Sequence, residues 1–200
     1  MNMNDKHFIN EYYEYLMKGL QDIKVTLGDG ASTDIQDGFD LCCDKIRSIR
    51  EAEGTVYFCG NGASATMAEH MSADWFKNGG VNTYSFSEIA SLTAISNDID
   101  YSQVFSYRLE RVNPKDSLIV GISSSGNSPN IVNALSTAKR KGMYTVSISG
   151  MKPDNRIRLI GDVNFYVPLD TYGLVESAHA ILLHMMLDYF KSTDNTEIDN

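Results

Sequence analysis

The alternation of short β-rich runs with longer segments of helical spacing is the feature that most limits how this chain can fold. Strands joined by helical crossovers pair in parallel, and right-handed crossovers place the connecting helices on both faces of the sheet. Ligands then bind beyond the carboxyl ends of the strands. The pattern therefore predicts a five-stranded parallel sheet between two helical layers, with strands at 55–59 (TVYFC), 83–86 (TYSF), 117–122 (SLIVGI), 144–149 (YTVSIS) and 163–167 (VNFYV).

Two helices are predicted before the first strand. Apolar side chains recur at helical spacing from Phe8 to Ile23 and again from Ile35 to Ile49, on either side of a break at 27–32 (LGDGAS). A chain of 200 residues with 42% hydrophobic content suits one globular domain. We therefore expect a single domain, 1–200, built from N-terminal helices at 1–50, an α/β core at 51–191 and a polar tail at 192–200.

The charge and cysteine content argue against several classes of protein. The chain carries 17 Lys and Arg against 26 Asp and Glu, and the basic residues are scattered, so we expect no nucleic-acid partner. Its three cysteines, two of them adjacent at Cys42 and Cys43, have neither metal-ligand spacing nor an even disulfide framework and are expected to be reduced and buried. Without a signal-peptide pattern or a run of about 18 apolar residues, a cytoplasmic protein with no membrane partner is expected.

Small polar residues crowd the segment 121–130 (GISSSGNSPN), where a strand gives way to a helix. The first turn of a helix carries unpaired backbone N–H groups and a partial positive charge, and small residues let an anion approach them. The serine hydroxyls add hydrogen-bond donors, Gly126 permits the turn, and Pro129 suits the first helical position. The segment therefore indicates a phosphate site, and a plain helix cap with a flexible loop is the alternative.

A second small polar loop, 60–64 (GNGAS), follows the first strand of the predicted sheet. Two strand ends would thus present such loops toward one crevice, which capping alone explains poorly. Neither loop has the lysine of a phosphate-binding P-loop, and the GNGAS segment does not satisfy the glycine spacing of a dinucleotide fingerprint. No nucleotide cofactor is therefore expected.

Four motifs resemble the sugar isomerase (SIS) domain family, and within it the sedoheptulose 7-phosphate isomerases, also called phosphoheptose isomerases. The resemblance runs from about residue 35 to residue 190 and rests on 59–75 (CGNGASATMAEHMSADW), 96–105 (SNDIDYSQVF), 121–143 (GISSSGNSPNIVNALSTAKRKGM) and 176–190 (ESAHAILLHMMLDYF). It implies a three-layer flavodoxin-like α/β fold with a five-stranded parallel sheet. It also implies N-terminal helices that help to form a homotetramer, with active sites at the subunit interfaces.

The resemblance also assigns roles residue by residue. It implies a phosphosugar substrate bound by Asn61, Gly62, Ala63, Asn97 and Asp98, with the phosphate held by Ser123, Ser124, Ser125 and Ser128. It implies one zinc ion per subunit, bound by His70, Asp74, Glu176 and His184. Five positions depart from the pattern of the family or of some of its members: Ala63 replaces Gly, Ser124 replaces Thr, Gly173 stands where some relatives carry Asp, Asp74 replaces Glu and Glu176 replaces Gln.

The last two departures fall within the catalytic set that the resemblance implies, which is Asp74, Glu176 and His184. Asp74 is one methylene shorter than the family's proton-transferring Glu, while Glu176 brings a second carboxylate, so either acid can be the base. His70 and Asp74 lie one helical turn apart and can grip one ion. Glu176 and His184 would lie about 12 Å apart along one helix, so either Glu176 precedes the helix or a neighbouring subunit supplies one ligand.

The implied reaction is an aldose–ketose isomerisation through an enediol, most simply of sedoheptulose 7-phosphate to D-glycero-D-manno-heptose 7-phosphate for nucleotide-activated heptose and surface glycans. Two other functions remain open: an isomerase for another sugar phosphate, and a non-catalytic binding protein that acts through phosphosugars or through partners, as relatives that associate with the replication initiator do. The presence of two histidines with two carboxylates favours an enzyme, because a pure binding protein has no need of an acid–base set.

Overall fold

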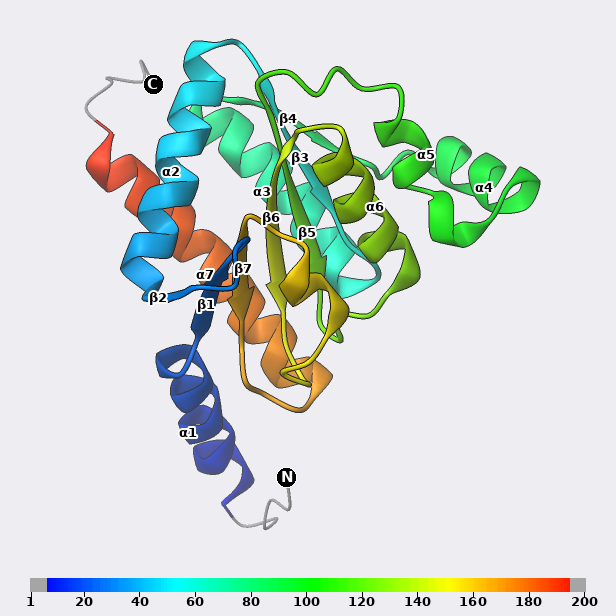
Figure 1. Cartoon of the computed structure of the whole chain (residues 1–200). Helices are drawn as coiled ribbons and strands as arrows, with labels where there is room; N and C mark the ends of the chain where they lie inside the picture. Colours follow the sequence, from blue (N-terminus) through cyan, green and yellow to red (C-terminus); the bar gives the residue numbers. More distant parts are fainter. Residues whose placement is uncertain (1–6, 195–200) are drawn as a thin grey trace.

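One mixed β-sheet organises the fold in this computed structural model, which describes residues 7–194 (Figure 1). Its parallel strands are β3 (Thr55–Cys59), β4 (Asn82–Ser85), β5 (Ser117–Ser123), β6 (Tyr144–Ser149) and β7 (Val163–Tyr166). The five predicted strands are confirmed, and each boundary lies within one residue of its prediction. They lie side by side in the order β4-β3-β5-β6-β7, which is the flavodoxin order.

A β-hairpin at the edge of the sheet corrects the prediction of five strands. β1 (Lys24–Leu27) pairs antiparallel with β7, and β2 (Ser32–Thr33) pairs with β1, which brings the sheet of the described residues to seven strands. The segment 27–32 therefore contains the hairpin turn, at residues 28–31, and is not a simple break between two helices. Val25 is only 1% exposed and pairs with Phe165, so burial stabilises a strand that is too short to show alternation in the sequence.

Helices cover both faces of the sheet and complete three layers (Figure 1). One face packs against α2, α3 and α7, which contribute Phe39, Trp75 and Phe190 to one buried apolar cluster. The other packs against α4, α5 and α6, which contribute Ile95, Leu109 and Ile131 to a second. The bounds are α2 (Ile35–Glu51), α3 (Ala63–Gly79), α4 (Ile89–Asp98), α5 (Ser106–Leu109), α6 (Pro129–Arg140) and α7 (Tyr172–Thr193), with 3-10 turns η1 (Tyr101–Gln103) and η2 (Arg156–Leu159).

The first helix, α1 (Phe8–Gln21), extends beyond the sheet at the lower left of Figure 1. Leu16 and Leu20 pack against a small apolar cluster that includes Leu174 and Val175 of α7. The rest of its apolar surface is solvent-exposed in a single chain, because Phe8, Ile9, Tyr13, Tyr15 and Met17 all remain exposed. Both predicted N-terminal helices are present, but Ile23 follows the end of the first one.

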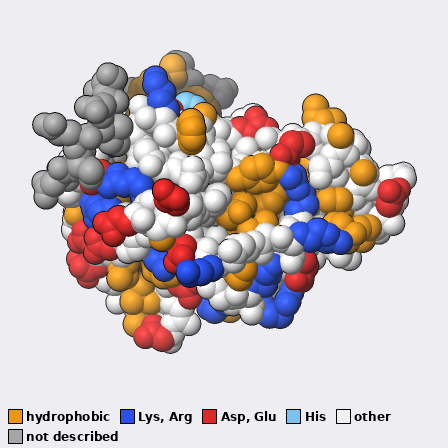
Figure 2. All heavy atoms as spheres, turned by 90° about the horizontal axis from the view of Figure 1, so that it is seen from above, with side chains coloured by type: hydrophobic (Ala, Val, Ile, Leu, Met, Phe, Trp, Pro, Cys, Tyr) orange, Lys and Arg blue, Asp and Glu red, His pale blue; other side chains and the backbone are white. Residues whose placement is uncertain are grey.

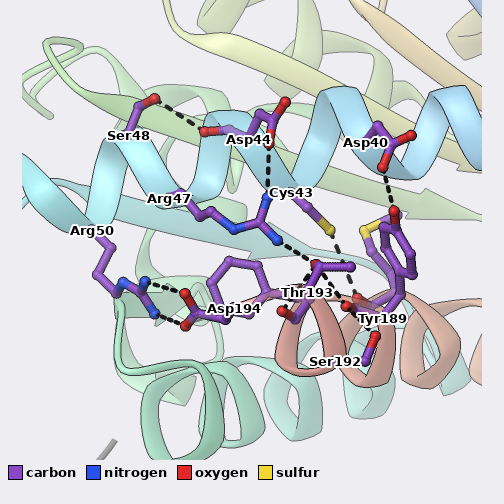
Figure 3. Close-up of polar contacts among 12 residues, drawn as sticks. Asp40, Cys43, Asp44, Arg47, Ser48, Arg50, Tyr189, Ser192, Thr193 and Asp194 are labelled. Atoms are coloured by element: carbon purple, nitrogen blue, oxygen red, sulfur yellow. Dashed lines mark hydrogen bonds and ion pairs between the residues drawn. The ribbon is translucent and has the colours of Figure 1, made fainter. Parts of the chain in front are cut away.

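Polar contacts fasten the end of α7 to α2 (Figure 3). Arg50 of α2 binds the Asp194 carboxylate through both guanidinium nitrogens, at 2.6 and 2.9 Å. Arg47 donates to Thr193, and Tyr189 donates to Asp40. The predicted polar tail therefore begins too early at residue 192, because Ser192 and Thr193 belong to α7; residues 195–200 of that tail lie outside the described part of the chain.

The cysteines are buried and free, as the sequence predicted. Cys42, Cys43 and Cys59 are each at most 1% exposed. Burial raises the pKa of the Cys43 and Cys59 thiols to about 12, so neither is a thiolate at neutral pH.

Acidic and basic side chains are interspersed on the face seen in Figure 2, and hydrophobic side chains gather mainly right of its centre. Mixed charges of this kind create no extended field of one sign on that face. Within residues 7–194, none of the helices combines the length and the apolar character that a bilayer crossing requires.

The buried His179 of α7 predicts how stability depends on pH. Burial lowers its pKa from 6.5 to about 4, so the folded protein holds this imidazole neutral. The contribution of this group to the free energy of unfolding is fully present above pH 6.5. It is lost as the pH falls towards 4, by at most about 1.4 kcal/mol per pH unit, because the unfolded chain then binds the proton more readily. Urea unfolding across this window should show the slope reduced in His179→Gln and retained in His7→Gln, a variant of an exposed histidine. Equal slopes in both variants would contradict the assignment.

Candidate active site

The carboxyl ends of two neighbouring strands bring the predicted small polar loops together. β3 and β5 pair in parallel, with Cys59 opposite Gly121, and the chain leaves them toward opposite sides of the sheet. Such a point of reversal is where open α/β sheets bind ligands. Asn61 and Asn130 join the two loops through a reciprocal pair of amide hydrogen bonds of 2.9 and 2.8 Å. Asn130 is a site residue that the sequence pattern does not single out, although it lies within the serine-rich segment.

A cavity of about 160 Å³ lies between these loops, and all four predicted phosphate-binding serines line it. The hydroxyl oxygens of Ser123 and Ser128 lie 3.2 Å apart, and Ser128 stands at the N-cap of α6 without capping it through its side chain. No Lys or Arg is among the residues that line this cavity, which we call the serine pocket: Asn61, Ser64, Ile122, Ser123, Ser124, Ser125, Ser128, Tyr172 and Glu176. An anion there would be held by hydroxyls and by the helix N-terminus.

A second cavity, of about 320 Å³, adjoins the serine pocket through Asn61, which lines both. Gly62 lines this second cavity and adopts a φ of 55° at the start of α3, which suits glycine. Ala63 begins α3 and is exposed, but it lines neither cavity. Tyr101, which the sequence does not single out, also lines the second cavity and donates a hydrogen bond of 3.0 Å to Asn61 Oδ1.

The predicted pair Asn97 and Asp98 lies apart from the serine pocket within this chain. Both residues are exposed at the C-terminal end of α4, and Asn97 Nδ2 donates to Asp98 Oδ1 at 2.8 Å. Neither lines either cavity. Tyr101, three residues further along the chain, is the first residue of that motif after Asp98 that lines the second cavity and contacts Asn61.

Two histidines and one carboxylate from α3 and α7 form a cluster with the geometry of a metal site. His70 Nε2 lies 3.3 Å and His184 Nδ1 3.9 Å from Asp74 Oδ2, and one ligand atom from each residue lies within 4.8 Å of the others. His70 and Asp74 share one face of α3, and the two imidazole rings are 5.2 Å apart. Imidazole and carboxylate form a normal donor set for zinc, and three protein ligands leave a coordination position for water or substrate.

Glu176 lies in the serine pocket and outside the metal cluster. The expectation that it could precede the helix is wrong, because α7 begins at Tyr172 and runs through Glu176 and His184 without interruption. Eight helical residues separate the two side chains, a rise of about 12 Å. Within one chain, the helix therefore gives Glu176 to the pocket and His184 to the cluster.

The same two helices set the spacing between the serine pocket and the metal cluster. On α3, Ser64 lines the pocket and His70 follows six residues later, a rise of about 9 Å. On α7, Glu176 lines the pocket and His184 lies about 12 Å further along. From this rise we expect a ligand that reaches both parts to carry its anionic group on the order of 9–12 Å from its reactive end.

Comparisons with known proteins agree with this fold. Residues 11–150 match the model of the SIS domain family. A phosphoheptose isomerase of Sulfurimonas denitrificans is 31% identical over 188 residues, 90% of this chain and 94% of the relative, and one of Helicobacter pylori strain P12 is 33% identical over 144 residues, 69% and 74%. The phosphoheptose isomerase structure from Neisseria gonorrhoeae superposes with a TM-score of 0.79 at 23% identity, covering 94% of this chain and 99% of that one.

The chain thus has the fold of a sugar-phosphate-binding SIS domain, as the family match and the superposition both indicate. It belongs to the SIS domain family and, within it, to the phosphoheptose isomerases.

The metal cluster predicts how zinc affinity responds to substitution. Asp74→Ala and His184→Ala each remove a direct ligand, and we expect each to weaken zinc binding by roughly a hundredfold or more, since even the partners of ligands contribute ten- to a hundredfold. Competition with a chromophoric chelator measures this, with His179→Gln as the control that alters a histidine outside the cluster. Unchanged affinity in both ligand variants would contradict a zinc site here. Glu176→Gln tests the fourth ligand: a loss of affinity would mean that a second subunit brings this carboxylate to the ion.

Proposed function

We propose that this protein is an aldose–ketose isomerase that converts sedoheptulose 7-phosphate to D-glycero-D-manno-heptose 7-phosphate. The observation that carries the proposal is the pairing of a serine pocket with a histidine–carboxylate cluster about two helical turns away, in a chain that belongs to the phosphoheptose isomerases. Because the chain belongs to that group, the first point to test is the reaction class, an aldose–ketose isomerisation. The spacing between the pocket and the cluster concerns a second point, the length of the sugar phosphate.

The spacing supports a long sugar phosphate. A distance of 9–12 Å between the phosphate and the reacting carbons matches an extended chain of about seven carbons, since each carbon–carbon bond advances the chain by roughly 1.3 Å. A three-carbon sugar phosphate bound in the serine pocket would not reach the cluster. Binding at the phosphate end would then hold C1 and C2 in place at the acid–base groups, so that binding energy contributes to the chemical step.

The reaction moves one proton between carbons and one between oxygens. A carboxylate removes a proton from C1 of the open-chain ketose, the C1–C2 enediol forms, and the same acid returns a proton to C2. When it does not bind the ion, His184 would transfer the hydroxyl proton from O1 to O2 and assist opening of the sugar ring. Zinc bound by His70, Asp74 and His184 would polarise the substrate carbonyl and stabilise the negative charge that develops on oxygen.

Two carboxylates compete for the role of base. Asp74 lies in the cluster, but a metal ligand is a weaker base because the ion's charge favours the deprotonated form. Glu176 has no such ligand role within its own chain, but it lies about 12 Å from His184. We propose that Glu176 of the partner subunit reaches the cluster in a homotetramer whose active sites lie between subunits. The exposed apolar side chains of α1, together with Tyr172, Ile181 and Met185 of α7, offer surface for that contact.

Product analysis tests the activity directly. Purified protein of defined metal content is incubated with sedoheptulose 7-phosphate and, separately, with the phosphates of arabinose, fructose and glucosamine, with and without zinc. We expect the seven-carbon ketose to be converted to an aldose phosphate and the shorter sugars to react far more slowly. Saturable binding of these sugars without turnover of any of them would contradict the isomerase and favour a binding protein.

The serines predict a change in KM more than in kcat. Ser124→Ala and Ser128→Ala each remove a hydroxyl that lines the pocket, and a hydrogen bond to a charged group contributes enough to predict a rise in KM of roughly tenfold. Because the phosphate does not change during the reaction, kcat should stay within a few-fold of the parent value. Ser136→Ala, at an exposed position on the same helix as Ser128, is the matched control. A large fall in kcat at constant KM would contradict the phosphate assignment.

A further inference from the structure

The rear of the serine loop (residues 123–128) is held by a segment distant in the sequence, residues 149–157. The amide of Gly150 donates to the carbonyl of Ser124 at 3.1 Å, and the amide of Ile157 donates to the carbonyl of Gly126, also at 3.1 Å. The Arg156 amide donates to Asn127 Oδ1 at 3.0 Å. The first two bonds occupy carbonyl oxygens of the loop, which would repel a phosphate, and all four serines of the loop line the pocket.

One side chain of that segment, Asn155, packs against the turn of the loop. It is 1% exposed, and a Cβ built on Gly126 would come within 2.0 Å of its Oδ1. Gly126 has a φ of 63°, a conformation that other residues rarely adopt. The turn therefore requires glycine for two reasons: this backbone conformation, and the Asn155 side chain that fills the space where a Cβ would lie. The Asn155 side chain therefore adds a packing contact at the turn to the three hydrogen bonds that hold the loop.

The Asn155 amide is itself anchored to the end of β6. Its Nδ2 donates to the carbonyl of Lys152 at 2.8 Å, to Ser149 Oγ at 3.2 Å and to the carbonyl of Gly150 at 3.4 Å. Its Oδ1 is buried and has no hydrogen-bond partner among the described residues. A buried acceptor without a partner is costly and rare, and such exceptions are often found where function fixes the geometry.

We propose that Asn155 is a positioning residue for phosphate binding, which fixes the Gly126 turn so that the serine hydroxyls and the start of α6 converge on one anion. Asn155 does not line the serine pocket, so its effect passes through the loop. The inference rests on the proposed phosphate role of that pocket. It adds a determinant of substrate affinity that lies outside the motifs of the sequence.

Direct binding of inorganic phosphate, measured by calorimetry on the full-length protein, tests the proposal. We expect Asn155→Ala to weaken phosphate binding on the order of tenfold, since displacements of about 1 Å in a binding site can cost up to a hundredfold. In turnover, KM for the sugar phosphate should rise by a similar factor while kcat and zinc affinity change little.

The matched control is Asn164→Ala, which removes an equally buried amide from β7. Asn164 Nδ2 donates to the carbonyls of Thr26 and Gly161, and Asn164 Oδ1 accepts from the Ser147 hydroxyl, so none of these bonds reaches the serine loop. We expect it to lower the melting temperature and to leave phosphate binding within twofold. If Asn155→Ala fails to fold, Asn155→Ser keeps a hydroxyl donor and takes its place.

The outcomes separate the two proposals. If the parent protein binds phosphate and the Asn155 variant binds it equally well, Asn155 has no positioning role and the inference is overturned. An equal loss of binding in the Asn164 variant overturns it as well, because the effect would then be general destabilisation. If the parent protein binds no phosphate, the serine pocket is misassigned, and the proposed function and the inference both fail.

Discussion

The parallel pairing of β3 with β5 is the constraint on which the rest of the site depends. These two strands run side by side, and their connections leave toward opposite sides of the sheet, so two loops must meet where the strands end. The hydrogen bonds between Asn61 and Asn130 close that junction. The serine pocket follows from this arrangement, because both of its loops start from strands that backbone ladders hold in register.

The helices that cover one face of the sheet then place the chemistry. α3 and α7 each contribute to the serine pocket near their start and to the metal cluster further along. Both are set by apolar burial, since Trp75 and Phe190 pack edge to face with ring centres 4.9 Å apart, and α7 is fastened to α2 at its far end (Figure 3). The spacing between pocket and cluster is thus a property of the core, although His70 and His184 are themselves half exposed.

Much of this arrangement is predictable from the sequence. The features that could not be predicted have identifiable physical reasons. Strong local signals predict all five parallel strands and the four serines. The edge hairpin could not be predicted because its strands are short and follow directly on a helix, so that Ile23 continues the helical pattern beyond the true end of α1. The sequence does not predict the roles of Tyr101, Asn130 and Asn155, because these roles arise from tertiary contacts with distant residues. The helical rise does predict that Glu176 and His184 lie far apart if one helix carries both. It does not predict whether Glu176 instead precedes the helix or a neighbouring subunit supplies one ligand.

The distance between the bound phosphate and the metal is the measurement that tests the central claim most directly. Cobalt(II) in place of zinc shortens the phosphorus relaxation time of a bound phosphate monoester by an amount that depends steeply on their separation. The helical spacing predicts a distance on the order of 9–12 Å, with both ligands in one crevice. A separation of about twice that or more would contradict the account, because no seven-carbon sugar could then join the serine pocket to the acid–base cluster.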